Sequence, residues 1–158
     1  MYYDKLSHSS ADSIRNTGTK IIITKAGLRG YLSSISNNSS RLDCFIVSKE
    51  NDEIVGEVVI NSIDWQNRSA STRIAIYQEK DYNKKYGTEG LQIALSYAFG
   101  MYNLHRIELQ VYSFNERAIH VYEKIGFKKE GVLRDALYFE NKYHDAIVMS
   151  ILVKEFKK

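Results

Sequence analysis

Residues 115–127 read NERAIHVYEKIGF, and this stretch predicts a helix with a clear beginning and end. Asn115, Ala118 and Tyr122 recur at helical spacing and therefore share one face. Gly126, followed by an apolar residue, is typical of a helix end because glycine readily adopts the left-handed conformation found there. We therefore expect a helix whose Asn115, Ala118 and Tyr122 face looks into a site.

The segments before this helix predict an α/β arrangement. Residues 105–114 are rich in apolar residues, as a buried strand is. Residues 91–102 carry apolar side chains at helical spacing, and residues 70–77 have the pattern of a strand. A strand, a crossover helix and another strand imply parallel pairing, with a ligand crevice at the carboxyl ends of the strands.

Four other segments have strand patterns. Residues 43–48 and 54–63 flank a charged turn and predict a hairpin, and residues 128–139 and 144–153 predict a second pair. The whole pattern is that of a single α/β domain, with a mixed, mostly antiparallel twisted sheet and flanking helices.

The beginning of the chain is different. Residues 1–19 are polar without a sustained apolar period, so we expect them to be poorly ordered or loosely docked, with one domain over residues 20–155. Residues 20–23 could form a short strand, and Thr24 could cap a helix that follows it.

The composition is that of a soluble globular protein. The chain has 158 residues, and its net charge of +3 is too small to indicate nucleic-acid binding. No apolar run approaches the roughly 18–20 residues of a spanning helix, and the first residues lack a signal-peptide pattern, so we expect a cytoplasmic protein without membrane contact. The single cysteine, Cys44, argues against a cysteine-rich metal site, and its apolar surroundings predict a buried, inert thiol. We expect no metal.

The spacing of Asn115, Ala118 and Tyr122, closed by a Gly-Phe pair, resembles the GNAT superfamily of N-acetyltransferases, in particular its bacterial ribosomal-protein and spermidine acetyltransferase branches. The resemblance runs from about residue 41 to residue 153. It implies the acetyltransferase fold with an abbreviated N-terminal strand and helix, and the edge left by that loss could pair in a homodimer. It also implies acetyl-coenzyme A as cosubstrate, with Tyr122 beside its sulfur and Asn115 in contact with it.

The loop between the strand at residues 70–77 and the next helix is the expected phosphate site, because backbone N–H groups and the positive helix end can bind phosphate there. Tyr82, Lys85 and Gly87 stand at the three specified positions of the family's loop, Arg/Gln-x-x-Gly-x-Gly/Ala, and only Gly87 conforms. If Lys85 needs a positive φ, its side chain would cost about 1–2 kcal/mol. The residues that the resemblance places at the cofactor are Tyr82, Asn83, Lys84, Lys85, Tyr86, Gly87 and Thr88 in the loop, Asn115, Ala118 and Tyr122 on the later helix, and the backbone of Ile74, Ala75 and Ile76.

The resemblance further implies transfer of an acetyl group to a primary amine by direct attack within a ternary complex. Tyr122 would donate to the departing thiolate, because a phenol with a pKa of about 10 is protonated at neutral pH. Related enzymes often carry the base on the strand that corresponds to residues 70–77, but the matching region here, residues 71–73, has no carboxylate. Glu57, on the strand predicted over residues 54–63, is therefore the leading candidate for the base, followed by Glu79 and Asp145. His120 should lie on another helix face, at the surface.

Protein N-termini and polyamines are the two leading acceptors, whether as small molecules or as peptides. Residues 28–36, 62–68 and 138–145 lie nearest the family's acceptor groove, and the last two bring acids and aromatic rings together, which suits a cationic amine. The alternative is an acyl-coenzyme A binding module without turnover, favoured by the altered loop, the short N-terminus and the missing carboxylate. A nucleic-acid binder is a third reading, but the 12 tyrosines are spread through predicted strands, as packing residues are.

Overall fold

The computed structural model describes residues 26, 29–30, 32–33 and 38–157. Our predictions for residues 1–19, for a strand at residues 20–23 and for an abbreviated start of the fold lie outside these residues. The described residues between 26 and 33 are helical, in agreement with the helix predicted after Thr24.

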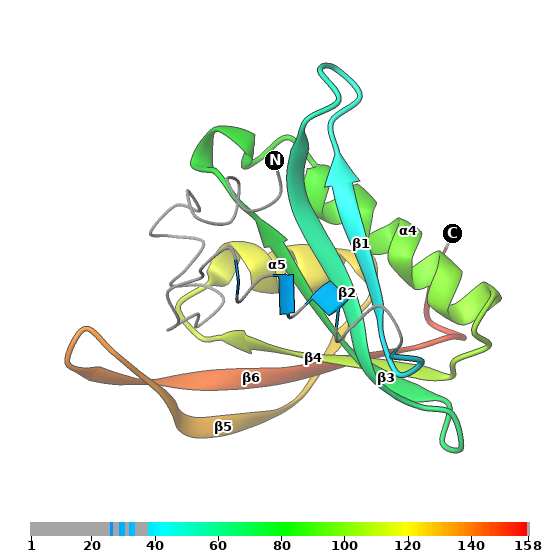
Figure 1. The fold of residues 1–158 in the computed structure, drawn as a ribbon. Helices are drawn as coiled ribbons and strands as arrows, with labels where there is room; N and C mark the ends of the chain where they lie inside the picture. The colour runs from blue at the N-terminus through cyan, green and yellow to red at the C-terminus, as the bar shows by residue number, and fades with distance from the viewer. Residues whose placement is uncertain (1–25, 27–28, 31, 34–37, 158) are drawn as a thin grey trace.

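A six-stranded mixed sheet organises the described part of the chain (Figure 1). Its strands are β1 (Leu42–Val47), β2 (Ile54–Asp64), β3 (Ser69–Ile76), β4 (Arg106–Tyr112), β5 (Lys128–Phe139) and β6 (Lys142–Leu152). Their order across the sheet is β1-β2-β3-β4-β6-β5, and among these described strands only β3 and β4 pair in parallel. The predicted mixed, mostly antiparallel sheet is therefore confirmed.

Two helices follow the parallel strands: α4 (Tyr86–Gly100) lies between β3 and β4 in the chain, and α5 (Glu116–Ile125) follows β4. In Figure 1 both helices lie behind the sheet, and apolar residues of both join one buried cluster with it. Gly90 allows α4 to approach closely, because a Cβ there would lie 2.8 Å from Cδ1 of Ile46. The apolar residues that recur at helical spacing in the sequence therefore pack against one face of the sheet.

Two single-residue predictions need correction. The helix predicted over residues 91–102 ends at Gly100, and the Tyr102 ring instead packs edge-on against Trp65, with centroids 5.4 Å apart. Cys44 is half-buried rather than buried, because it lies on the edge strand β1. Partial burial, helped by the charge of neighbouring Asp43, still raises the pKa of the Cys44 thiol.

The parallel strands β3 and β4 stay paired only near their beginnings. Their Cα partners run from Ser69 with Arg106 to Ser71 with Glu108. Beyond this point β3 continues beside β2 and β4 continues beside β6, and Figure 1 shows the two strands diverging. The sheet therefore opens into a fork toward the carboxyl ends of β3 and β4.

The α5 helix begins and ends with two local devices. Asn115 is the N-cap, one residue before the helix, and its Oδ1 accepts the N–H of Ala118 at 3.2 Å. At the other end Gly126 has φ +117, and the N–H groups of Gly126 and Phe127 donate to the Tyr122 carbonyl at 3.1 and 3.0 Å. The predicted glycine end is confirmed, because this conformation is strained for any residue with a Cβ.

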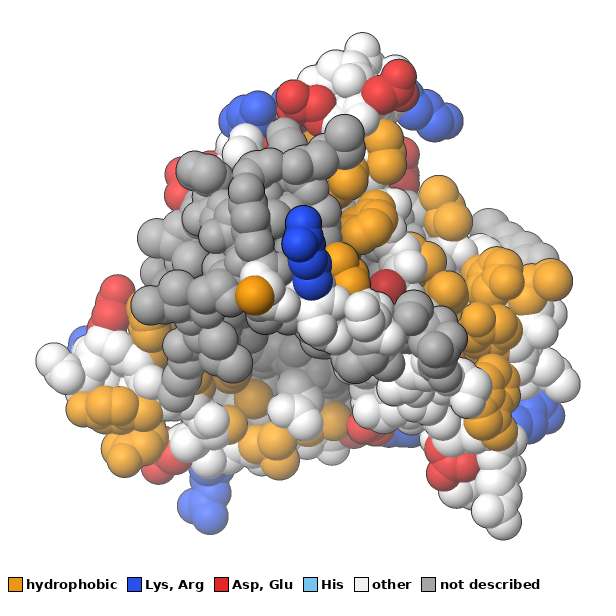
Figure 2. Space-filling model, in the orientation of Figure 1, with side chains coloured by type: hydrophobic (Ala, Val, Ile, Leu, Met, Phe, Trp, Pro, Cys, Tyr) orange, Lys and Arg blue, Asp and Glu red, His pale blue; other side chains and the backbone are white. Residues whose placement is uncertain are grey.

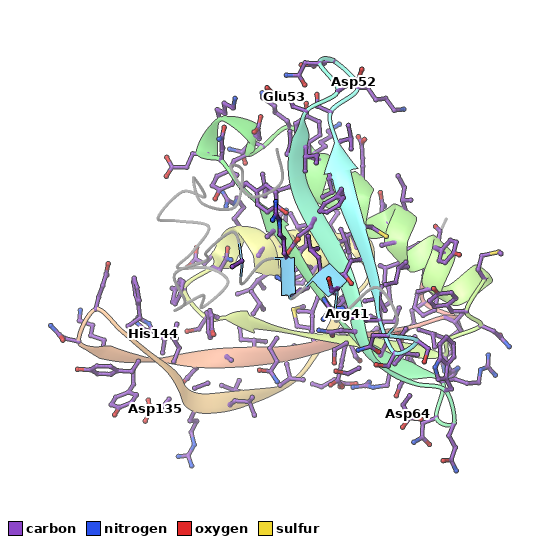
Figure 3. All side chains as sticks on the ribbon, in the orientation of Figure 1. Arg41, Asp52, Glu53, Asp64, Asp135 and His144 are labelled. Carbon is purple, nitrogen blue, oxygen red and sulfur yellow. The ribbon has the colours of Figure 1, made fainter. Side chains whose placement is uncertain are left out.

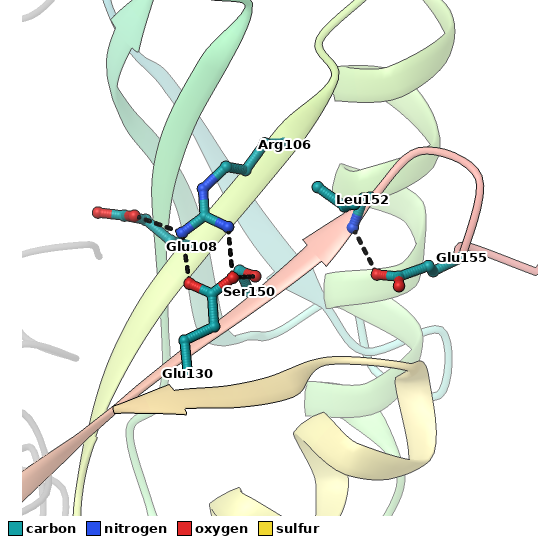
Figure 4. Close-up of polar contacts among 6 residues, drawn as sticks. All are labelled: Arg106, Glu108, Glu130, Ser150, Leu152 and Glu155. Carbon is teal, nitrogen blue, oxygen red and sulfur yellow. Dashed lines mark hydrogen bonds and ion pairs between the residues drawn. The ribbon is translucent and has the colours of Figure 1, made fainter. Parts of the chain in front are cut away.

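A polar network joins β4, β5 and β6 (Figure 4). Arg106 donates to both carboxylate oxygens of Glu130, at 2.7 and 2.6 Å, and to Glu108 at 3.0 Å. The Ser150 hydroxyl also donates to Glu130, at 2.6 Å. The bonds from Arg106, and then that from Ser150, lower the pKa of Glu130 to about 2. The network ties edge strand β5 to the centre of the sheet.

Exposed hydrophobic side chains gather along β1 and α4 (Figure 2). They include Phe45 and Val47 of β1 and Ile93 and Tyr97 of α4, which line a cavity of about 510 Å³ between the two elements. The predicted homodimer is not tested by this surface and stays a prediction. Of the helices described, none is both long and apolar enough to cross a membrane.

Candidate active site

A cavity of about 240 Å³ lies in the fork of the sheet. Residues 72–76 of β3 and residues 110–112 of β4 line it, together with Tyr82 and side chains of α5. Among the residues predicted at the cofactor, those that line this cavity are residues 74–76, Tyr82, Asn115, Ala118 and Tyr122. The shared face predicted for Asn115, Ala118 and Tyr122 does look into a cavity.

The fork exposes an edge of β3. Beyond Ser71 this strand has no strand partner on the β4 side among the described residues, so the backbone of residues 74–76 borders the cavity. A strand edge offers N–H and C=O groups at regular spacing, and an extended chain that carries amides can bind along it. The arrangement suits the amide-bearing arm of an acyl-coenzyme A.

The loop after Tyr82 presents backbone N–H groups. Lys85 has φ 64 and ψ 0 and is the N-cap of α4 without a side-chain cap bond, so the positive φ considered from the sequence is present. The first helical bond of this turn runs from the Glu89 N–H to the Lys85 carbonyl, at 2.9 Å. The N–H groups of residues 86–88 therefore precede the hydrogen-bond ladder, at the positive end of a helix, where anions bind favourably.

The side chains of this loop point to different surroundings. Asn83, Lys84 and Lys85 are exposed, and Lys84 lies 3.5 Å from a carboxylate oxygen of Asp81. Tyr86 lines the other cavity instead, where its hydroxyl is 3.0 Å from the Ser48 hydroxyl. Gly87 and Thr88 are half-buried in the first turn of α4. Because its side chain lies in the other cavity, Tyr86 can contribute only its backbone N–H to a phosphate site.

Tyr122 lies in the cavity wall and is 7% exposed. Its ring packs against Phe127, with centroids 5.8 Å apart. Burial raises the pKa of the Tyr122 hydroxyl to about 12, so the hydroxyl remains protonated across the neutral range. Tyr122 thus brings a protonated phenol to the wall of the cavity.

Glu57 does not line the cavity. Its carboxylate is buried on β2, where it lies 2.8 Å from the Arg73 guanidinium and accepts a hydrogen bond of 3.1 Å from the Tyr77 hydroxyl. Arg73 does line the cavity, so Glu57 acts on the cavity wall through it. The carboxylate of Asp145 accepts the N–H of Asp135 at 2.9 Å, and none of the described lining residues is Asp, Glu or His. A base function for Glu57 stays a prediction.

Two arginines in the cavity wall were missed by the sequence reading. Arg73 comes from β3, and Arg117 comes from the first turn of α5, where its guanidinium carbon lies 3.9 Å from the centre of the Tyr82 ring. Helical spacing puts Arg117 off the face of Ala118 and Tyr122, and only the long side chain brings its charge back to the cavity. The sequence signal available was a cation two residues after the helix cap Asn115.

The segments predicted near the acceptor groove separate in space. The turn at residues 62–68 precedes β3 and lies away from the fork, and Figure 3 shows Asp64 far from His144 and Asp135. The hairpin between β5 and β6 is instead connected to the cavity by a row of packed aromatic rings. The ring centroids of His144 and Phe114 are 4.9 Å apart, and those of Phe114 and Tyr112, a lining residue, are 5.6 Å apart. Most of residues 28–36 lie outside the described part of the chain.

Comparison with known proteins decides the family. Residues 20–148 match the family described as the acetyltransferase (GNAT) domain. The chain belongs to the GNAT family. Members of this family are acetyl-coenzyme A-dependent N-acetyltransferases, so the predicted class of enzyme and the predicted cosubstrate are confirmed at the level of the family.

Curated GNAT relatives include polyamine enzymes. The spermidine N(1)-acetyltransferase of Vibrio cholerae is 32% identical over 126 residues, which cover 80% of this chain and 71% of the relative. The spermidine N(1)-acetyltransferase of Escherichia coli K12 is 34% identical over 104 residues, covering 66% of this chain and 55% of that enzyme. YdaF of Bacillus subtilis, provisionally named a ribosomal N-acetyltransferase, is 31% identical over 66% of this chain and 56% of its own length. The chain thus spans little more than half the length of the last two.

Solved structures agree on the GNAT fold. The crystal structure of the Vibrio cholerae spermidine N-acetyltransferase with coenzyme A and spermine superposes with a TM-score of 0.88, at 23% identity, over 98% of this chain and 90% of that one. A chimera of the same enzyme gives a TM-score of 0.78 at 26% identity, over 84% of this chain and 81% of the chimera. The predicted acetyltransferase fold is confirmed.

Proposed function

We propose that this chain transfers the acetyl group of acetyl-coenzyme A to a primary amine by direct attack within a ternary complex. One observation carries the proposal: a buried tyrosine, Tyr122, lies in the wall of a cavity between two diverging strands. Tyr82 in the same wall leads into a helix start whose first N–H groups precede the helical hydrogen bonds. When bound, acetyl-coenzyme A supplies the acetyl group as an activated thioester.

Three parts of the chain would hold the cosubstrate. The backbone edge of residues 74–76 would bind the pantetheine arm. The N–H groups of residues 86–88 would bind the pyrophosphate, with Lys85 nearby as a source of positive charge. The side-chain oxygen of Asn115 already accepts the N–H of Ala118, so its amide nitrogen is the group that can donate to a ligand.

Tyr122 would act on the departing sulfur as a hydrogen-bond donor. Burial raises the pKa of the Tyr122 hydroxyl to about 12, so the phenol holds its proton, and its transfer to a departing thiolate is costly. A hydrogen bond to the developing charge carries no such cost, because the proton stays on the phenol. Tyr122 therefore stabilises the thiolate, and the proton that neutralises it comes from the attacking amine or from water.

The attacking amine must be neutral. The described cavity lining contains no carboxylate, and its Arg73 is paired with Glu57 at 2.8 Å, so no described lining group stabilises the protonated form of an amine there. Glu57 would take, through a water molecule, the proton that an ammonium acceptor loses before it attacks, with Arg73 lying between its carboxylate and the cavity; the second amine proton, lost as the amide forms, is the one that can neutralise the thiolate. This assigns Glu57 two tasks, to position Arg73 and to accept a proton.

A polyamine is the first acceptor to test, and a protein N-terminus is the second. The printed names of the Vibrio cholerae and Escherichia coli relatives support a polyamine, and the provisional name of YdaF supports a ribosomal protein. An α-amino group has a pKa of about 8, so its neutral form is easier to reach than that of an alkyl amine at about 10. The two acceptors should therefore differ in pH dependence, the alkyl amine needing the higher pH.

The test is a comparison of coenzyme A thiol release with spermidine, a free amino acid and short peptides with free N-termini. The hydrolysis rate without amine is the background, and calorimetry with acetyl-coenzyme A reports binding separately. We expect release above background with spermidine. Binding without release for any of these amines would favour the alternative, an acyl-coenzyme A binding module.

A further inference from the structure

The outer face of α4 carries apolar side chains where a surface helix normally carries charged ones. Ile93 and Met101 are 71% and 72% exposed, and Tyr97, midway between them in the sequence, is 42% exposed. Met101 keeps helical backbone angles, and its N–H donates to the Tyr97 carbonyl at 2.8 Å, so the three side chains form one ridge along the helix. Residues 90–104 contain no charged side chain. The exposed face of α4 is therefore apolar and uncharged over most of its length.

The ridge is part of a continuous apolar surface, which we call the α4 surface (Figure 2). Ile93 and Tyr97 line the same cavity as exposed side chains of β1. Toward the end of the helix, the Tyr102 ring links Tyr97 to Trp65, with centroids 5.2 and 5.4 Å apart. The exposed side chains of the α4 surface are Phe45, Val47, Trp65, Ile93, Tyr97 and Met101.

The α4 surface is larger than the apolar surface that a chain acting alone usually exposes. A large side chain has roughly 150–250 Å² of surface, so six of them, each about half exposed or more, present on the order of 600–700 Å². The largest patch on a typical monomer is roughly 300–600 Å², whereas each side of a stable interface buries about 800 Å². Aromatic residues and methionine without charged residues are also typical of an interface core. The α4 surface therefore has the size and the chemistry of a protein interface.

A second copy of this chain fits the α4 surface. A ridge of residues four apart packs into the groove beside the same row on another helix, which is the commonest kind of helix packing. Two α4 helices that run in opposite directions about a twofold axis at Tyr97 place Ile93 of each copy against Met101 of the other. This direction also brings the positive start of each helix toward the negative end of the other. Residues 86–88 then lie beyond the end of the opposing helix, so it does not cover the proposed phosphate site.

We propose that this chain forms a dimer in which α4 of one copy packs antiparallel against α4 of the other through Ile93, Tyr97 and Met101. The exposed side chains of β1 in each copy then lie toward the end of the other copy that carries Trp65. The interface is a helix face rather than a strand edge. The dimer needs no ligand, so it does not depend on the proposed function.

The test is the assembly state of the full chain, measured by sedimentation velocity over a range of concentrations. The parent should sediment with twice the mass of one chain at micromolar concentrations. Ile93→Glu should weaken the dimer at least about a hundredfold, because the twofold axis buries the new carboxylate twice without a partner. Val132→Glu is the matched control, because Val132 is 42% exposed on β5, at the opposite edge of the sheet; this variant should stay within about twofold of the parent.

A pair of introduced charges tests the direction of the helices. Met101→Lys alone should weaken the dimer as Ile93→Glu does. In the double variant Ile93→Glu/Met101→Lys, antiparallel helices bring the introduced carboxylate of each copy to the introduced ammonium of the other. The double variant should therefore dimerise at least about tenfold more tightly than either single variant at low salt, and high salt should reduce this gain. Parallel helices would instead bring like charges together.

Circular dichroism confirms that each variant is folded, and Met101→Lys carries the same test if Ile93→Glu does not fold. A parent that stays monomeric at every concentration would overturn the proposal, as would a dimer that folded Ile93→Glu and Met101→Lys leave intact, or a double variant no tighter than the single ones. If the parent forms a larger assembly, a loss of mass in Ile93→Glu but not in Val132→Glu supports the proposal, and an unchanged mass overturns it. None of these outcomes requires coenzyme A, so failure of the dimer leaves the proposed function standing.

Discussion

Replacing Lys85 by glycine should stabilise the protein, although it removes a lysine from the proposed phosphate loop. Lys85 is held at φ 64, its side chain is exposed, and it makes no side-chain cap bond to α4. The backbone therefore adopts a conformation that L-residues avoid, and the side chain gives the helix no cap in return. Lys85→Ala is the matched control, since it removes the same charge and keeps a Cβ.

The size of the effect follows from the backbone conformation. A Cβ in the left-handed region costs about 1–2 kcal/mol, and glycine gives back about 0.5–1 kcal/mol because its unfolded chain is more flexible. Lys85→Gly should therefore be more stable than Lys85→Ala by about 0.5–1 kcal/mol. For a chain of 158 residues this corresponds to a melting temperature higher by about 1–4 °C.

Thermal unfolding of both variants, without ligand and at one pH, measures this difference. A glycine variant that melts at or below the temperature of the alanine variant would refute the strain argument. Coenzyme A binding gives an independent check, because both variants lose the same cation. Both should bind more weakly than the parent at low salt, and screening should bring them close to the parent at high salt.

Three further predictions test the site and its scaffold. Tyr122→Phe should lower kcat by about 10–100-fold and leave coenzyme A affinity nearly unchanged, because the lost hydrogen bond acts only as the thiolate departs. Gly90→Ala should destabilise the fold by about 1–3 kcal/mol in chemical denaturation, because the new Cβ would lie 2.8 Å from Ile46, whereas Gly100→Ala, with nothing within 4 Å, should not destabilise it. The free energy of unfolding of Glu130→Gln should fall less steeply on acidification than that of the parent. The pKa of Glu130 is lowered to about 2 in the folded state, so its contribution is present above its ordinary pKa of 4.5 and is lost as the pH falls from 4.5 toward 2.

Each of these has a contradicting outcome. An unchanged kcat in Tyr122→Phe removes the hydroxyl from the mechanism. Equal effects of alanine at Gly90 and Gly100 would mean that the contact with Ile46 does not limit the approach of α4. If the melting temperatures of parent and Glu130→Gln fall by the same amount between pH 4.5 and pH 2, the bonds from Arg106 do not stabilise the fold.

The sequence alone determined the local elements of this protein. Helical spacing, an asparagine cap and a closing Gly126 were enough to place α5, because each depends on residues within a few positions of one another. The strands followed in the same way from their apolar patterns, and their boundaries agree to within two residues. Asn115, Ala118 and Tyr122 also followed, since one helix face brings them together.

Tertiary structure alone decided how the cavity is charged and where its edges lie. Nothing local in β3 or β4 says that they part after Ser71, because that depends on which strands each pairs with on its other side. The contact between Arg117 and Tyr82 and the pair of Arg73 with Glu57 join separate elements in the same way. Long side chains reach partners that spacing along one element does not reveal, so the chemistry of the cavity wall is fixed only when the elements pack.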